Sequence, residues 1–408
     1  MTDSYARHSG LPARTFESPR SDLLFSLNPH IFRRRSDVSF HLRFASARQA
    51  LERLGWSPFF EDQRTRLGRN DLPFARVIEE QRGAYRVAGE LTGWVEVSGR
   101  LRHEATSTAD FPAVGDWVGI RGAPLEPRDA SERGIVEIRL ERRSTVARAA
   151  AGRAVDRQVI AANVDTIFVV TALDRDLNPR RLERYLTIVW EGGALPVVLL
   201  NKVDLCGEIE HACERVRSRL PFVDIIGVSA LRGDGLGALA PYLRPSQTIA
   251  LIGSSGVGKS ALVNRLTATE RQRVNHLDGD GKGRHTTTSR QLIELPGGAL
   301  LIDTPGMREL QPWGDVSAVE ATFDDIAALA LQCRFGDCGH DGEPGCAVCG
   351  AVDSGRLDPD RLENYRRLLR ELAFEQRKRD KSAAAGARRQ LKQMMRAQKA
   401  LYRDRDRS

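Results

Sequence analysis

From Ala75 to about Leu140 the chain consists of short stretches of β-forming residues separated by turns. Five or so short strands within about 65 residues are typical of a small barrel such as an OB-fold. We therefore predict an OB-fold over residues 75–150, after a short lead-in at 47–74. The clearest stretches are Gly83–Val87, Gly93–Val97, Gly115–Ile120 and Gly134–Ile138.

After Gln158 the pattern changes to apolar strands that alternate with helix-like segments. This alternation predicts a mostly parallel sheet with helices on both faces, over residues 151–312. Ligands of such sheets bind at the carboxyl ends of the strands. The expected strands are Thr166–Thr171, Leu195–Leu200, Val223–Val228, Thr248–Ile252 and Ala299–Ile302, and the expected helices are Arg180–Glu191, Glu208–Arg219, Gly235–Tyr242 and Lys259–Thr267.

The totals fit a multidomain chain that works in the cytoplasm. Its 408 residues, 41% of them hydrophobic, suffice for two or three domains with cores of their own. No apolar run approaches the roughly 20 residues of a membrane span, and the N-terminus lacks the pattern of a secretory signal. Residues 1–46 are polar and irregular, so we expect a disordered extension there.

The net charge of +8 is concentrated at the C-terminal end. From Arg361 to Ser408 there are sixteen Lys/Arg against six Asp/Glu, so the rest of the chain has a net charge of −2. A long, basic, helix-prone end suits a polyanion, and its attraction should fall steeply with salt. The alternative is a charged helix that is merely solvated.

A phosphate-binding loop follows one of the expected strands. Gly253 to Ser260 matches G-x-x-x-x-G-K-[ST] between a strand and a helix. Backbone N–H groups of such a loop wrap the phosphates, Lys259 reaches the β and γ oxygens, and Ser260 can ligate Mg²⁺. The expected contacts are Gly253, Ser254, Ser255, Gly256, Val257, Gly258, Lys259, Ser260 and Ala261.

A guanine-reading motif selects GTP or GDP over adenine nucleotides. It consists of Asn201, Lys202, Val203 and Asp204, directly after a strand. Asp204 can accept hydrogen bonds from N1–H and the 2-amino group of guanine, and adenine offers neither donor there. Lys202 would pack along the base. Ser229 and Ala230, at the end of the next strand, are expected to present backbone N–H groups to the guanine oxygen.

The guanine motif precedes the phosphate loop, whereas ordinary GTPases have the opposite order. Both motifs are intact, so we predict a complete P-loop GTPase domain whose chain is circularly permuted. Permutation is possible because the termini of a domain usually lie close together.

The remaining parts of a GTPase site come later in the chain. Asp303 to Gly306 reads D-T-P-G after a strand, so Asp303 can hold the Mg²⁺ shell through water and the Gly306 N–H can sense the γ-phosphate. Thr287 is the favoured Mg²⁺ ligand from the preceding glycine-rich loop. Met307 stands where many GTPases have a water-orienting Gln, and His285 is the candidate to replace it; a purely structural role for this histidine is the alternative.

Three cysteines and a histidine are spaced as zinc ligands. Cys333, Cys338, His340 and Cys346 fall within fourteen residues and fit a closed tetrahedral Cys₃His site with one structural Zn²⁺. Cys349 allows an exchange of one ligand, and a redox pair or unliganded thiols are the alternatives. We expect residues 313–408 to form a mainly helical zinc-binding domain with a basic tail.

Together these motifs resemble the RsgA (YjeQ) family, bacterial GTPases of late small-subunit assembly. The resemblance also rests on the segments Leu54–Trp56, Phe111–Trp117, Gln158–Asp165 and Cys333–Cys346. It implies an OB-fold, a permuted GTPase and a zinc domain, with GTPase activity stimulated by the small ribosomal subunit. We expect a monomer that binds the subunit and its rRNA and no membrane. We hypothesise that the protein binds the subunit's rRNA in its GTP state and is released from it when GTP is hydrolysed.

Two rival functions remain open at this point. One is a GTP-binding, RNA-binding scaffold without significant turnover, and the other is a GTP-dependent metal chaperone. Repeated GTP hydrolysis would argue against the scaffold, and zinc that resists mild chelation would argue against the chaperone.

Overall fold

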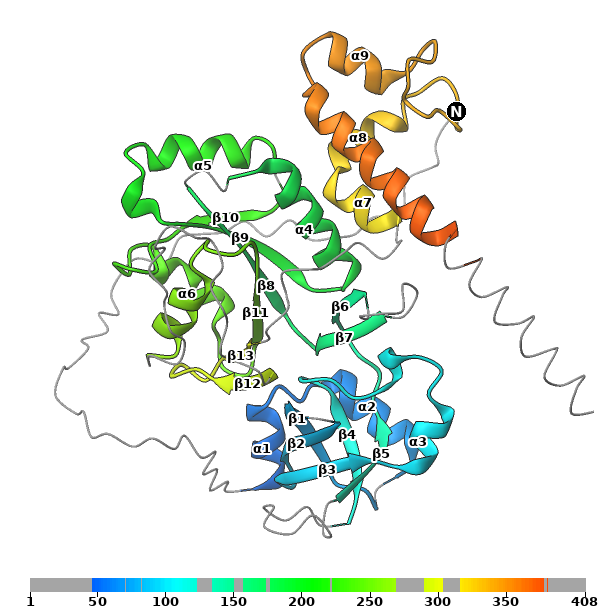
Figure 1. The fold of residues 1–408 in the computed structure, drawn as a ribbon, viewed down its shortest axis with the longest axis vertical. Helices are drawn as coiled ribbons and strands as arrows, with labels where there is room; N and C mark the ends of the chain where they lie inside the picture. Colours follow the sequence, from blue (N-terminus) through cyan, green and yellow to red (C-terminus); the bar gives the residue numbers. More distant parts are fainter. Residues whose placement is uncertain are drawn as a thin grey trace, which may run out of the picture. The chain divides into compact units, whose positions relative to one another are not determined.

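The computed structural model describes residues 46–69, 71–81, 83–122, 134–149, 157–173, 177–220, 222–268, 290–303, 316–377 and 380. Figure 1 labels the helices and strands used below. The extension expected at the N-terminus, up to residue 45, and the basic tail beyond residue 380 fall outside these residues. None of the helices described has both the length and the apolar character of a membrane span.

Five strands form the barrel that the sequence predicts. Their order is β1-β2-β3-β5-β4, and β4 pairs back to β1, which closes the barrel. All pairs are antiparallel except β3 with β5. Valines such as Val77, Val95 and Val136 are fully buried in its core. The strands are β1 (Phe74–Gln81), β2 (Ala84–Gly89), β3 (Gly93–Val97), β4 (Trp117–Arg121) and β5 (Gly134–Arg139).

Short helices accompany the barrel. Ser46 caps the first one by accepting from the backbone N–H of Gln49 (3.3 Å), and Gly68 in the left-handed conformation ends the second. Trp56, between these two helices, packs edge-on against Trp117 of β4, so the lead-in belongs to the barrel's hydrophobic packing. The helices are α1 (Ala47–Arg53), α2 (Pro58–Leu67), α3 (Gly99–Glu104) and the 3₁₀ turn Thr108–Asp110.

A hairpin leads from the barrel into the second region. It joins β6 (Thr145–Ala149) to β7 (Arg157–Ala162) as a separate two-stranded antiparallel sheet. Sequence analysis did not predict this hairpin.

The α/β region has the strand order β10-β9-β8-β11-β13-β12. The first five strands are parallel, as predicted, and β12 is antiparallel to β13. The strands are β8 (Thr166–Ala172), β9 (Leu195–Asn201), β10 (Asp224–Gly227), β11 (Thr248–Ile252), β12 (Arg290–Glu294) and β13 (Leu300–Asp303). The helices are α4 (Pro179–Glu191), α5 (Ile209–Arg217) and α6 (Lys259–Leu266), with a 3₁₀ turn at Val203–Leu205.

One predicted helix has a different form. The segment Leu236–Tyr242 is a 3₁₀ helix that contains Pro241. Proline has no N–H to donate and its ring crowds the preceding turn, so a regular α-helix is unfavourable there.

The sheet continues without a break from the α/β region into the barrel. Strand β12 pairs antiparallel with β1, so eleven strands form one hydrogen-bonded array. Arg76 on β1 is 1% exposed and holds this junction. Its guanidinium donates to the carbonyl oxygens of Leu54, Gly115 and Asn163 and to the hydroxyl of Thr248 at the start of β11 (2.9 Å). Burial lowers the pKa of Arg76 to about 10.

The C-terminal region is helical, as predicted, and has its own apolar core around Val319, Phe323 and Leu368. A buried carboxylate joins it to α4. Glu183 accepts from Arg219 (2.8 Å) and from Arg361 (2.9 Å), and the side-chain amide of Asn364 donates to its other oxygen. The helices are α7 (Val316–Thr322), α8 (Asp324–Ala330), α9 (Ala347–Asp353) and one over residues 359–377.

Replacing Arg76 with Met should destabilise the protein. The variant leaves buried acceptors at the junction without donors, so we expect the free energy of unfolding to fall by about 2–5 kcal/mol. Urea unfolding followed by tryptophan fluorescence measures this change. Arg121→Met, at an exposed position on β4, is the control and should change stability by less than about 1 kcal/mol. Equal losses in both variants would contradict the assigned role of Arg76.

Candidate nucleotide site and metal centre

The phosphate loop lies between β11 and α6, as the sequence predicts. Gly253 has a φ of 142°, and a Cβ there would lie 2.1 Å from the carbonyl oxygen of Val170 on β8. The close approach of these backbones therefore excludes any side chain. Lys259, the first residue of α6, donates from Nζ to the carbonyl oxygens of Gly253 (2.8 Å) and Ser254. Ser260 and Ala261 follow it in the first turn of the helix.

The guanine motif follows the end of β9. Asn201 is the last residue of the strand, and Lys202 adopts a left-handed conformation with φ 64°. This turn leads into the 3₁₀ segment that carries Val203 and Asp204. The Asp204 carboxylate accepts from the hydroxyl of Ser229 (2.6 Å), which fixes its orientation.

Asn201 connects the guanine motif to the phosphate loop. Its amide Nδ2 donates to the carbonyl oxygen of Val257 (2.8 Å), and its Oδ1 accepts from the backbone N–H of Ala230 (3.0 Å). The side chain is buried, so both bonds are shielded from water. At Gly258 a Cβ would lie 2.2 Å from Nδ2, which explains a glycine at that position. One side chain thus joins three segments that are far apart in the sequence.

Backbone donors near the expected base site have partners already. The Ser229 N–H donates to the carbonyl oxygen of Asp234 (2.9 Å), and the Ala230 N–H donates to Asn201. A contact from either group to the guanine oxygen, as predicted from the sequence, would have to share or replace these bonds.

The remaining predicted residues fall at the edge of the described chain. Asp303 is the last residue of β13. Because β13 runs parallel to β11, it ends at the same edge of the sheet as the phosphate loop. His285, Thr287, Gly306 and Met307 lie outside the described residues.

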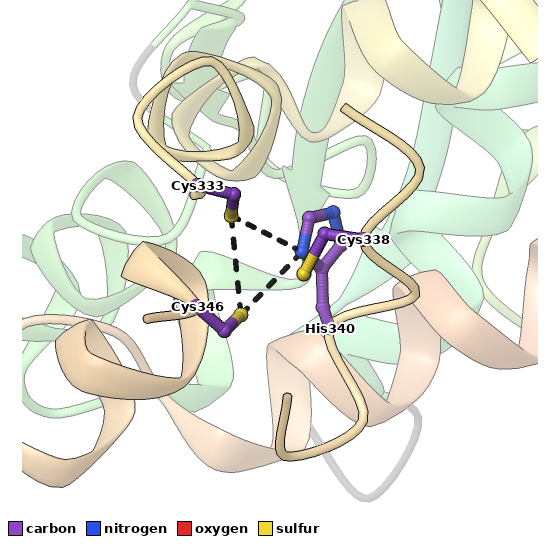
Figure 2. Close-up of side chains that lie close together, drawn as sticks. All are labelled: Cys333, Cys338, His340 and Cys346. Carbon is purple, nitrogen blue, oxygen red and sulfur yellow. Dashed lines mark hydrogen bonds between the residues drawn. The ribbon is translucent and has the colours of Figure 1, made fainter. Parts of the chain in front are cut away.

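The four predicted zinc ligands come together in the C-terminal region. The ligand atoms of Cys333, Cys338, His340 and Cys346 all lie within 4.8 Å of one another, and Figure 2 shows the four side chains facing a common centre. Nδ1 of His340 is 3.6 Å from the sulfurs of both Cys333 and Cys346. Three thiols and one imidazole in this arrangement fit a closed tetrahedral Zn²⁺ site.

Cys349 takes a different position. Its Sγ donates to the carbonyl oxygen of His340 (3.2 Å), and its backbone N–H donates to the sulfur of Cys346 (3.3 Å). Burial alone would raise the pKa of Cys346, but this N–H and the contact with His340 lower it to about 6, which favours the thiolate that binds metal. The structure thus brings Cys346, and not Cys349, together with the other three clustered side chains, and Cys349 contacts two members of the cluster.

Sequence reasoning missed Arg366, which supports the same site. Its guanidinium also donates to the carbonyl oxygen of His340, a residue with a φ of 57°. An arginine within a charged helix carries no signal that would have identified this contact.

Comparison with known proteins agrees with this geometry. A family model described as "RsgA GTPase" matches residues 139–313. A protein of Opitutus terrae, named "Small ribosomal subunit biogenesis GTPase RsgA", is 47% identical over 361 residues, which cover 86% of this chain and 97% of the relative. The chain belongs to the RsgA GTPase family. A second relative with the same printed name, from Syntrophotalea carbinolica, is 44% identical, over 79% of this chain and 90% of the relative.

Solved structures of RsgA-like proteins share the fold. A crystal structure of YjeQ from Thermotoga maritima matches with a TM-score of 0.55 and 24% identity, over 74% of this chain and 99% of that one. The structure of YloQ, described as a circularly permuted GTPase, matches with a TM-score of 0.51 over 74% and 96%. The predictions of a barrel and a permuted P-loop domain are confirmed, as is a C-terminal region with a Cys/His cluster compatible with zinc. Membership of the RsgA GTPase family implies GTP or GDP and Mg²⁺ as ligands.

Metal analysis separates the four clustered side chains from Cys349. With Cys346 as the predicted ligand and Cys349 as its hydrogen-bond partner, we expect Cys346→Ser to lose most of the zinc and Cys349→Ser to keep most of it. Loss of a group that hydrogen-bonds to a metal ligand weakens metal affinity by about 10- to 100-fold. Competition with a graded series of chelators should therefore still separate Cys349→Ser from the unmodified protein. Zinc loss of equal extent in both variants would contradict this assignment.

Proposed function

We propose that this chain hydrolyses GTP to GDP and phosphate in late maturation of the small (30S) ribosomal subunit. The observation that carries the proposal is a pair of hydrogen bonds made by the Asn201 side chain. It donates to the Val257 carbonyl and accepts from the Ala230 N–H, and so joins the guanine motif to the phosphate loop. The subunit comes from the printed name of relatives that are up to 47% identical over most of the chain.

In this proposal the base is read by Asp204. Its carboxylate, oriented by Ser229, accepts from N1–H and the 2-amino group of guanine, and the stem of Lys202 covers one face of the base. Adenine offers Asp204 neither donor, and the loss of both hydrogen bonds at a site built for them disfavours ATP strongly. Asn201 acts by holding this turn against the phosphate loop.

The phosphates are bound by the loop and the start of α6. Backbone N–H groups from Gly253 to Gly258 face the oxygens, and the ammonium of Lys259 turns from the carbonyls it now contacts to the β- and γ-phosphates. Ser260 and Thr287 would ligate Mg²⁺, and Asp303 would hold its shell through water. Bound Mg²⁺ neutralises the charge that develops on the phosphate oxygens.

The attacking water is assigned to His285 because Met307 cannot orient it. An imidazole can accept a proton from the water and hold it in line with the γ-phosphate. Since no water-orienting glutamine follows the D-T-P-G motif, we expect intrinsic hydrolysis to be slow until the small subunit binds.

The barrel and the zinc-bearing region would contact the subunit's rRNA. The basic C-terminal segment supports this, because it carries a net charge of +10 in a chain whose total is +8. The GTP state would hold both regions on rRNA, and hydrolysis would release the chain.

Turnover with and without purified small subunits tests the proposal. We expect subunits to raise the rate of GTP hydrolysis by a factor on the order of ten or more, and the effect to weaken as salt increases. Lys259→Ala should abolish nucleotide binding while zinc content and circular dichroism stay unchanged. A rate that is indifferent to subunits would contradict the assigned partner. GTP binding without repeated hydrolysis would favour the scaffold alternative instead.

A further inference from the structure

Strand β12 separates the expected Mg²⁺ site from the barrel. On one side Gln291 pairs with Asp303, the last residue of β13. On the other side the same Gln291 pairs with Glu79 of the barrel strand β1. Asp303 is therefore only two strands from the barrel, and the register of β12 decides which backbone groups stand opposite it.

Ion pairs to the N-terminal regions hold both ends of β12. Arg290 at its start contacts Glu80 of β1 at 2.7 Å, with side-chain exposures of 13% and 24%. Glu294 at its end contacts Arg53 of α1 at 2.7 Å, but Arg53 is half exposed. Partly buried pairs are less screened by solvent than exposed ones, so Arg290–Glu80 should be the stronger of the two.

The pairing of β12 with β1 is short. The strand has five residues, of which two pair with β1. A slip of one residue would move every side chain to the opposite face of the sheet, and smaller shifts would tilt the strand against β13. The ion pair opposes both movements because it joins the side chains of directly opposed residues, Glu80 and Arg290.

We propose that Glu80 and Arg290 are positioning residues for Asp303. By fixing β12 between the barrel and β13, they set the position of the carboxylate that holds the Mg²⁺ shell. The inference rests on the proposed role of Asp303. Mg²⁺ requires near-ideal octahedral geometry, so a small displacement of this carboxylate should weaken metal-dependent retention of GTP.

The guanine site gives an internal reference for this effect. It lies at the ends of β9 and β10, and β8, β11 and β13 separate β9 from β12. Loss of the ion pair should therefore alter the Mg²⁺ requirement and leave the preference for guanine over adenine nucleotides unchanged. A general loss of stability would not produce that separation.

The experiment measures the release of a fluorescent GTP analogue from the full-length protein over a range of Mg²⁺ concentrations. For Glu80→Gln and Arg290→Gln we expect the Mg²⁺ concentration that halves the release rate to rise by about two- to fivefold. The double variant E80R/R290E, which reverses the charges of the pair, should return this Mg²⁺ concentration most of the way to that of the unmodified protein. Arg64→Gln breaks an ion pair of similar burial, to Glu90 at 2.8 Å, away from β12, and should show no shift.

The inference is overturned if neither single variant shifts the Mg²⁺ midpoint, or if Arg64→Gln shifts it equally. Should the single variants fail to fold, the reversed pair decides: a midpoint near that of the unmodified protein supports the proposal, and a raised one contradicts it. Because the readout is nucleotide release, absent GTP turnover would refute the proposed enzymatic function separately.

Discussion

The candidate nucleotide site depends on two hydrogen bonds made by the side chain of Asn201. Its amide nitrogen donates to the Val257 carbonyl in the phosphate loop, and its amide oxygen accepts from the Ala230 N–H. The side chain is buried, so both hydrogen bonds are shielded from water. Chain order plays no part in this geometry. The strand order β9-β8-β11 brings the motifs to one edge of the sheet, so a permuted chain builds the same site as an unpermuted one.

Two further junctions connect this site to the rest of the chain. The pairing of β12 with β1 extends the sheet into the barrel, and the buried Arg76 of β1 contacts Thr248 at the start of β11. The buried Glu183 joins α4 to the C-terminal region through Arg361. A buried carboxylate with several donors is costly to separate from them.

Most of the architecture could be predicted from local patterns in the sequence. The parts that were missed depend on contacts between residues that are far apart in the chain. β11 was predicted with its observed bounds because a continuous apolar run precedes a glycine loop. β12 was missed because its sequence, Arg-Gln-Leu-Ile-Glu, is short and polar at both ends, and its partner on β1 lies about two hundred residues away. Spacing alone identified the four side chains that cluster but left Cys349 undecided, since its position depends on where its sulfur points. The roles of His285 and Thr287 stay predictions.

The central claim is that Asn201 makes one site from two motifs, and the affinity of Asn201→Ala for GDP tests it most directly. The variant leaves the Val257 carbonyl and the Ala230 N–H without their partner, so affinity should fall by about tenfold or more while zinc content and secondary structure are retained. A folded variant that binds GDP as tightly as the unmodified protein would contradict the account.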